Sequence, residues 1–269
     1  PSSYMKQEMK SIVGDNGASW KVKNAPTTMA IHSTNNVFFI DNDGWIHRAW
    51  FNTFTQSWNQ HIISNTSDNS QKAFGDLIVD PDPDNRRVFY KGIDNKIHAY
   101  TSIYSPYSWN HEIIMPSYQP LKSGTYGTLK GRLDGSQTQL FYIHKDGQIC
   151  SFKENGSGSW AWQNLNPTYI QNHKAKGNLI VNKNRVAYVG IAGQTQMYIY
   201  KTRNGQTKWW HEDIIPPSGN TTPMDEPNSL AFADNGTLVY LRVDGWLARW
   251  IGSKLTAGSW IWSQMFLAR

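Results

Sequence analysis

Cysteine, charged residues and long apolar runs are all scarce in this chain of 269 residues. The single cysteine, Cys150, excludes an intrachain disulfide, so strand pairing and packing must hold the fold together. No stretch reads as a transmembrane span, and nothing resembles a signal peptide. No window of a dozen residues keeps the apolar period of about 3.6 residues that a helix needs. The sequence therefore predicts an all-β protein that does not insert into a membrane.

What the chain does have is a segment that recurs five times. Each copy contains an apolar pair of the Phe-Tyr kind, a tight turn, a second strand-like run, and a Trp that opens a last short stretch. Trp58, Trp109 and Trp160 follow one another at equal intervals of 51 residues. Such a period indicates a radial or stacked repeat architecture. The copies span 36–63, 87–114, 139–162, 185–214 and 237–262.

Each copy is preceded by one more short apolar stretch, as at 29–31 and 77–79, so a repeat offers four strands. The strands are rich in Val, Ile, Tyr, Phe and Trp, and Asp-Gly pairs of the hairpin type separate them. We expect a β-propeller of five four-stranded blades, with 26–269 as one domain. The expected repeats are 26–72, 73–122, 123–174, 175–225 and 226–269. Residues 1–25 are expected to form an additional N-terminal hairpin.

Charge and acidic clusters give little support to other functions. The net charge of +6 is spread along the chain, and the one dense group, at Lys6, Lys10, Lys21 and Lys23, matches no nucleic-acid motif. Several propellers are glycosidases or sialidases, and residues 15–20 resemble an Asp box, but that motif is a structural turn. The eight histidines lack metal-ligand spacing. We expect no nucleic-acid partner, no cofactor, no metal and no catalysis.

The second copy, residues 88–114, carries a family resemblance. Its order of Val-Phe-Tyr, Asp-Asn, Lys-Ile-His-Ala-Tyr and Trp-Asn-His-Glu-Ile-Ile resembles the repeats of propeller lectins, including the fucose-binding type of fungi and bacteria. The resemblance covers residues 26–265 as a repeat pattern. It implies a sugar bound between adjacent blades, with polar side chains on its hydroxyls and an aromatic ring against its apolar face.

Two positions that bind sugar in the fucose type differ here. Its Arg before the Val-Tyr-Tyr strand is matched only at Arg87 and Arg185, and its Glu in the following strand is not matched. The Arg position is otherwise occupied by Asn36, Gln139 and Thr237, and the Glu position by Arg48, Ala99, Ser151 and Arg249. Fucose specificity is therefore not implied.

Copies one and five share a Gly-Trp-aliphatic-X-Arg sequence, which puts Trp45 near Arg48 and Trp246 near Arg249. Lys96, Gln148 and Gln194 stand near the Trp position in the other copies, which indicates access to solvent. In a closed ring of five blades these pairs would meet, and an exposed Trp beside an Arg suits a sugar or an acidic glycan. Alternatively, the two tryptophans close the ring and the arginines stack on them.

A second set of candidates follows the repeated Trp, beginning with His61 in the first copy. These polar side chains could line pockets between blades, or simply lie on the surface of outer strands. The remaining candidate ligand-binding residues are His47, Arg87, His98, Trp109, His111, Glu112, Arg185, Trp210, His211 and Glu212.

The function predicted from the sequence is multivalent glycan recognition by a non-enzymatic lectin. Degenerate sites at several blade junctions would give avidity on a glycan-coated surface, which suits a secreted or surface-acting protein. The alternatives are a propeller glycoside hydrolase or sialidase and a protein-interaction propeller. The sugar and any homo-oligomer are left open.

Overall fold

A computed structural model describes the backbone of most of the chain. The described residues are 23, 25, 27–33, 36–80, 86–103, 108–115, 119–133, 138–155, 158–165, 173–215, 230–233, 237–242, 247–254 and 260–267. Side chains are not described for 33, 133, 213–215, 247–254 and 260–267. The chain divides into two compact units, residues 1–120 and 121–269. Of the predicted N-terminal hairpin, 1–25, only Lys23 and Ala25 lie within the described residues.

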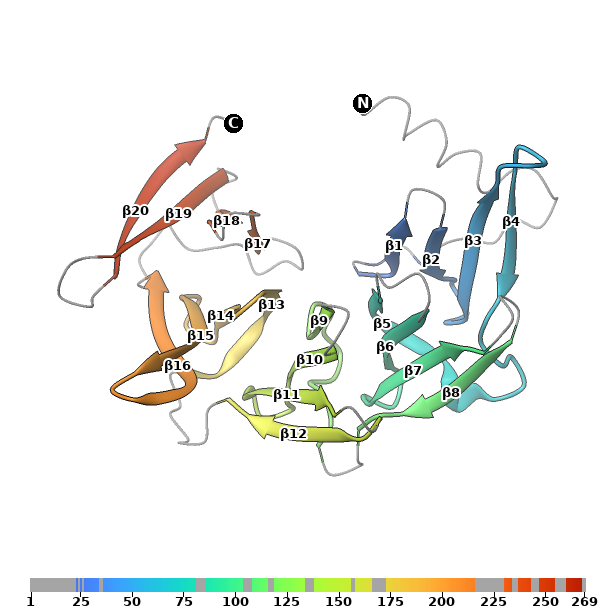
Figure 1. Ribbon diagram of the computed structural model, residues 1–269, viewed down its shortest axis with the longest axis horizontal. Helices are drawn as coiled ribbons and strands as arrows, with labels where there is room; N and C mark the ends of the chain where they lie inside the picture. Colours follow the sequence, from blue (N-terminus) through green and yellow to red (C-terminus); the bar gives the residue numbers. More distant parts are fainter. Residues whose placement is uncertain are drawn as a thin grey trace. The chain divides into compact units, whose positions relative to one another are not determined.

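The first unit contains two four-stranded antiparallel sheets, in each of which the strands follow one another in chain order (Figure 1). One sheet is formed by β1 (Met29–Ser33), β2 (Asn36–Ile40), β3 (Ile46–Asn52) and β4 (Ser57–Ile62). The other is formed by β5 (Ala73–Val79), β6 (Arg87–Gly92), β7 (Ile97–Ser102) and β8 (Trp109–Ile113). A short 3-10 helix, Asn69–Gln71, precedes β5.

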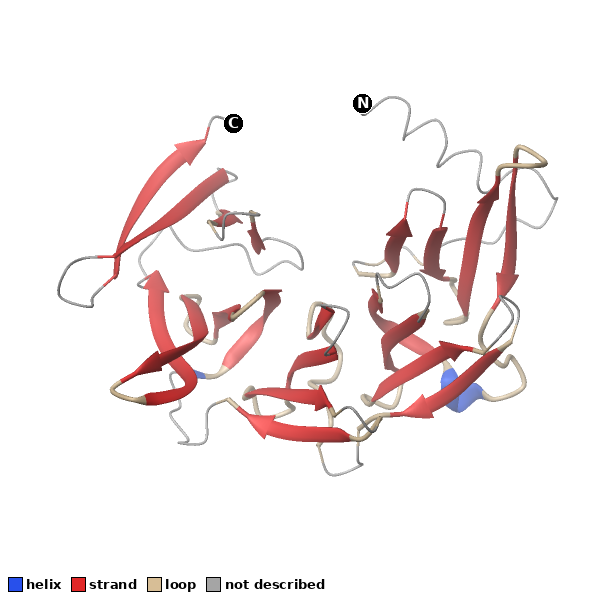
Figure 2. Ribbon diagram, in the orientation of Figure 1, coloured by secondary structure: helices blue, strands red, loops and turns tan. Residues whose placement is uncertain are grey.

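The described part of the second unit contains three further sheets of the same kind, and Figure 2 shows the predominance of strand. The first is β9 (Leu129–Leu133), β10 (Thr138–Ile143), β11 (Ile149–Glu154) and β12 (Trp160–Asn164). The second is β13 (Ala175–Asn182), β14 (Arg185–Gly190), β15 (Thr195–Arg203) and β16 (Gln206–Ile215). The third is β17 (Leu230–Phe232), β18 (Leu238–Leu241), β19 (Leu247–Lys254) and β20 (Trp260–Leu267). Among the described residues, no helix is long and apolar enough to cross a membrane.

In two sheets, the glycine of the turn after the second strand is hydrogen-bonded to the next sheet of the unit. Gly44 has a φ of 89°, and its carbonyl oxygen accepts a hydrogen bond of 2.8 Å from the N–H of Ala73 in β5. Gly147, with a φ of 84°, accepts one of 2.7 Å from the N–H of Ala175 in β13. A left-handed turn residue in close contact with another backbone requires glycine, which explains the recurrent Asp-Gly pairs.

The hydrophobic cores lie between consecutive sheets of a unit. In the first unit, Phe38 and Ile46 of one sheet pack with Val88 and Tyr100 of the next. In the second, Phe141 packs with other apolar residues of β10–β16, and a further cluster joins β14 and β15 to β17 and β18. The first strands of consecutive sheets, β1 and β5 or β9 and β13, are also in contact.

Sequential four-stranded meanders whose inner strands adjoin, with apolar wedges between sheets, constitute a β-propeller. The predicted fold class is therefore confirmed, with five four-stranded sheets among the described residues. Cys150, the free cysteine, is buried in β11, and burial raises the pKa of its thiol to about 12. A thiol in this environment belongs to the packing rather than to the chemistry of a site.

Candidate functional site

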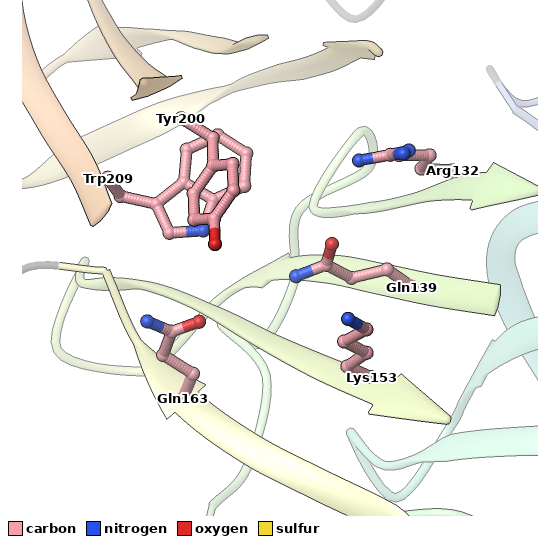
Figure 3. Close-up of a pocket in the computed structure, with 6 residues that line it drawn as sticks. All are labelled: Arg132, Gln139, Lys153, Gln163, Tyr200 and Trp209. Carbon is pink, nitrogen blue, oxygen red and sulfur yellow. The ribbon is translucent and has the colours of Figure 1, made fainter. Parts of the chain in front are cut away.

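A pocket of about 230 Å³ lies in the second unit between the sheet β9–β12 and the sheet β13–β16. We call it the inter-sheet pocket. Figure 3 shows its aromatic side and its polar side facing each other. It is lined by Arg132, Gln139, Lys153, Gln163, Tyr200 and Trp209.

Strand register brings the polar side together. Gln139 in β10 lies directly opposite Arg132 in β9 and Lys153 in β11, so the three side chains share one face of the sheet. Gln163 in β12 lies opposite Ser151, two residues before Lys153, and therefore belongs to the same face. The buried hydroxyl of Ser151 accepts a hydrogen bond of 3.1 Å from Nε2 of Gln139. This bond orients the amide that lies at the centre of the polar side.

The aromatic side comes from the next sheet. Tyr200 in β15 and Trp209 in β16 are direct cross-strand neighbours with ring centroids 5.4 Å apart. Trp209 is only 8% exposed and its indole meets Phe141 of the preceding sheet edge to face, whereas Tyr200 is 43% exposed. The core thus fixes the indole, and the phenol ring beside it offers an accessible aromatic surface.

This combination suits a polar ligand with one apolar face. Amide, guanidinium and ammonium groups donate directed hydrogen bonds, and aromatic rings pack against C–H groups. None of the described lining residues is a carboxylate or a histidine. The side chains that are described can hold and orient a ligand, and the cations among them favour a negatively charged group.

The first unit has an equivalent place between β1–β4 and β5–β8, which we call the Arg48 junction. It consists of Asn36, Arg48, Trp50, His61 and Trp109. The buried guanidinium of Arg48 donates to Oδ1 of Asn36 at 2.7 and 3.1 Å and lies 5.1 Å from the centroid of Trp50. The indole N–H of Trp109 donates across the junction to Nε2 of His61, at 3.3 Å. Five polar and aromatic side chains from both sheets therefore interlock here.

The surroundings of His61 in this junction disfavour its charged form. Burial, followed by the charge of Arg48, lowers the pKa of its imidazole to about 4. Because Nε2 accepts a hydrogen bond from Trp109, the neutral ring is the form that the junction holds.

The two junctions are built on the same register positions but differ in their residues. Trp50 and Ser102 of the first unit correspond to Lys153 and Tyr200 of the second, and Arg48 corresponds to Ser151. Arg48 lies opposite Phe38 in the first sheet, as Ser151 lies opposite Phe141 in the third. The long side chain of Arg48 occupies the space between its sheets, whereas the short Ser151 leaves room for the inter-sheet pocket. By the resemblance to the fucose-binding lectins, Arg48 and Ser151 correspond to their Glu, and Asn36 and Gln139 correspond to their Arg. Both pairs are hydrogen-bonded in this chain.

Other predicted site residues on β3, β7 and β8 form buried polar clusters. His47 is fully buried and bonded to Asp41 at 2.8 Å. His98 is also fully buried and lies between Asp94 and His111, at 2.9 Å from each. Burial lowers the pKa of both His47 and His111. The adjacent Glu112 is exposed.

Of the two arginines at the family's Arg position, Arg87 is buried and forms an ion pair of 3.1 Å with Asp80. This ion pair gives Asp80 a structural role. Arg185 begins β14 and is half-buried.

The His-Glu pair of the fourth copy is divided between two sets of contacts. His211 stacks on His173, with centroids 3.5 Å apart, and meets Tyr198 edge to face. Glu212 forms an ion pair with Lys201. Trp210 donates its indole N–H to the carbonyl oxygen of Lys201, on the strand face opposite to Trp209.

The predicted site at the ring closure lies partly outside the described residues. Trp45 is half-buried, and the ammonium group of Lys72 lies 4.9 Å from its ring centroid. Trp246 is not among the described residues, and Arg249 lies in β19 with its side chain undescribed. Lys96 and Gln148 are half-buried and Gln194 is buried, so the expected access to solvent varies among the copies. This site stays a prediction.

Four lining residues of the inter-sheet pocket, Arg132, Lys153, Gln163 and Tyr200, carry no repeat signature and were missed. Trp209 could have been found from spacing. In Trp109-X-His111 and Trp209-X-His211 the two residues are separated in the same way, and both tryptophans contact a Phe of the preceding sheet. The sequence prediction instead selected Trp210, because it directly precedes His211.

Solved structures with a similar fold include a lectin. The BP39L lectin of Burkholderia pseudomallei is 16% identical over 90% of this chain and 69% of that chain, with a TM-score of 0.53. This chain has the fold of the propeller lectins. The predicted family resemblance is thereby confirmed at the level of the fold.

Proteins with other activities share the fold too. A periplasmic gluconolactonase, PpgL, of Pseudomonas aeruginosa is 15% identical over 87% of this chain and 70% of that chain, with a TM-score of 0.52. The SREBP–SCAP binding domains of fission yeast are 10% identical over 88% of this chain and 64% of that chain, with a TM-score of 0.52. No protein-family model matches the sequence. No curated protein matches it either. Function must therefore be argued from the site.

Proposed function

We propose that this chain binds carbohydrate in the inter-sheet pocket and releases it unchanged. The observation that carries the proposal is the pairing of an exposed ring, Tyr200, with a face of hydrogen-bond donors on the adjacent sheet. A pyranose presents C–H groups on one face and hydroxyls around its rim, which matches these two sides.

The size of the pocket suits a small ligand. Its volume of about 230 Å³ lies below the range of roughly 300–1,000 Å³ typical of drug-sized ligands, so one sugar ring fits better than a long oligosaccharide. Its position between two sheets is also the one that the resemblance to propeller lectins implies.

The test is binding by a variant that loses the exposed ring. Tyr200→Ala should weaken binding to any glycan selected on an array by roughly tenfold, since an aromatic contact contributes about 0.5–1.5 kcal/mol beyond the area it buries. Tyr200→Phe should bind nearly as well as the parent. Phe54→Ala is the matched control, because Phe54 is 95% exposed and belongs to the β3–β4 turn.

Isothermal titration calorimetry with the selected glycan measures these affinities, and circular dichroism confirms that each variant is folded. Equal affinity of Tyr200→Ala and the parent would show that sugar binds elsewhere or not at all. Assays with aryl glycosides and aldonolactones address the alternative of an enzyme. Turnover that Tyr200→Ala or Gln163→Ala abolishes would replace the binding proposal with a hydrolase.

We further propose that the protein is multivalent and acts at glycan-bearing surfaces outside the cell. The repeat itself supports this, since five four-stranded sheets are described and consecutive sheets of a unit pack in the same way. The Arg48 junction is filled by its own arginine, so further sites are expected at other junctions. Agglutination of erythrocytes that a soluble glycan inhibits would be expected. A single site per chain in calorimetry, without agglutination, would contradict multivalency.

A further inference from the structure

The charge of the inter-sheet pocket points to a narrower class of ligand. Its two ionised lining residues, Arg132 and Lys153, both carry positive charge. The other four lining residues, two glutamines and two aromatic residues, are uncharged at neutral pH. A ligand with an anionic group would be bound by charge-assisted hydrogen bonds, which are roughly twice as strong as neutral ones.

The placement of the two cations is set by the sheet rather than by flexible loops. Arg132 and Lys153 lie opposite Gln139 on its two neighbouring strands, so their strands are separated by about 10 Å. Each side chain is long enough to extend over Gln139 from its own side. Figure 3 shows the two charged groups on the polar side of the pocket, across from Tyr200 and Trp209.

Gln139 adds a donor between the cations. Its amide nitrogen has two N–H groups, and one of them is directed to the hydroxyl of Ser151. The other can donate to a ligand oxygen. Arg132, Gln139 and Lys153 thus form a row of three donors across three adjacent strands.

We infer that the inter-sheet pocket selects acidic sugars, in which a pyranose ring lies on Tyr200 and an attached carboxylate or sulfate ester lies over Gln139 between Arg132 and Lys153. This inference rests on the proposed function and narrows it. The common chemistry is a singly charged oxyanion carried by one sugar ring.

The test compares matched pairs of ligands by calorimetry. The probes are the methyl glycosides of gluco-, galacto- and manno-configured uronic acids, their neutral hexose counterparts, and the corresponding 6-sulfates. The best uronide or sulfate should bind at least tenfold more tightly than its own neutral counterpart. The preference should shrink as the salt concentration rises, because surface charges are screened. The uronide and sulfate series distinguish the two sources of the anion.

Variants locate the effect. Lys153→Gln should reduce the affinity for the acidic ligand about tenfold more than the affinity for its neutral counterpart, so that the preference within a pair largely disappears. Lys145→Gln is the matched control, because Lys145 is an exposed lysine in the turn before β11 and is not among the lining residues. It should alter neither affinity.

The possible outcomes distinguish a failure of this inference from a failure of the proposed carbohydrate binding. If the neutral and acidic members of every pair bind equally, and Tyr200→Ala still binds more weakly than the parent, the acidic preference is overturned. The proposal of sugar binding then stands. A preference for acidic sugars that survives Lys153→Gln would also overturn it. Absence of binding to all probes and to a glycan array would overturn both proposals.

Discussion

His61 should make the first unit sensitive to mild acid. The indole of Trp109 donates to its Nε2 at 3.3 Å, and burial together with the charge of Arg48 lowers its pKa from 6.5 to about 4. An unfolded chain would protonate this imidazole near its ordinary value, whereas the folded chain resists protonation. Between those two values the unfolded state therefore binds more protons, so stability falls as the pH is lowered through this window.

The size of the effect follows from the shift. At about 1.4 kcal/mol per pKa unit, this shift corresponds to a loss of roughly 3 kcal/mol in the free energy of unfolding at pH 4. Because solvent screens a half-buried ring, we expect a loss of about 1.5–2 kcal/mol. Urea unfolding monitored by tryptophan fluorescence at pH 7, 6, 5 and 4 measures this loss of stability. His47, His111 and His144, whose pKa values are also lowered, add to the parent's slope with the same sign.

The matched variant is His61→Gln. Glutamine occupies the equivalent position at Gln163, can accept the bond from Trp109, and does not titrate. The variant should lose less stability than the parent between pH 7 and pH 4, by about 1.5–2 kcal/mol. Parallel stability curves for the two proteins would refute the assignment of a neutral, half-buried His61. A histidine resonance in the parent that titrates near pH 6.5 and is missing from the variant would refute it as well.

Three further predictions concern the second unit. Phe141→Ala should lower the free energy of unfolding by about 3–5 kcal/mol in urea titrations, because this fully buried ring packs against Trp209; a loss below 1 kcal/mol would contradict its place in the core. Gly147→Ala should lower the free energy of unfolding by about 1–2 kcal/mol in the same assay, since a φ of 84° disfavours a side chain and the new Cβ would lie 3.1 Å from the Cβ of Lys174. An unchanged urea midpoint would argue against this turn geometry. Ser151→Arg should reduce glycan affinity at least tenfold in calorimetry by filling the inter-sheet pocket as Arg48 fills its junction, and full binding by a folded variant would be inconsistent with that comparison.

The fold could be predicted from the sequence because its determinants are local and repeated. The turn glycines, the apolar pairs such as Phe141-Tyr142, and the evenly spaced tryptophans each recur in several copies, so their spacing carries the architecture. The first strand of the third repeat was expected but its residues were not identified, because Leu129–Leu133 includes a lysine, a glycine and an arginine and lacks the three consecutive apolar residues of the other first strands.

The candidate site was less predictable, because it is formed by two repeats that are adjacent in space. Lys153 belongs to the face of one sheet and Tyr200 to the facing surface of the next, and nothing in either repeat alone shows that they meet. The sequence did identify the register positions of Asn36, Arg48, Gln139 and Ser151 through the family resemblance. Whether a position is filled by its own side chain or left open depends on side-chain length, as Arg48 and Ser151 show.

The pocket's construction from two repeats has a consequence for how such a protein diversifies. In the sheet β13–β16, one face packs on the preceding sheet of its unit and the other face packs on the following sheet. A substitution on one face therefore alters a single junction, whereas exchanging a whole repeat alters two at once. Single substitutions can change the ligand specificity of one junction while the neighbouring junctions keep theirs. Exchanged repeats create new pairs of facing sheets, and therefore combinations of lining residues that neither parent junction contained.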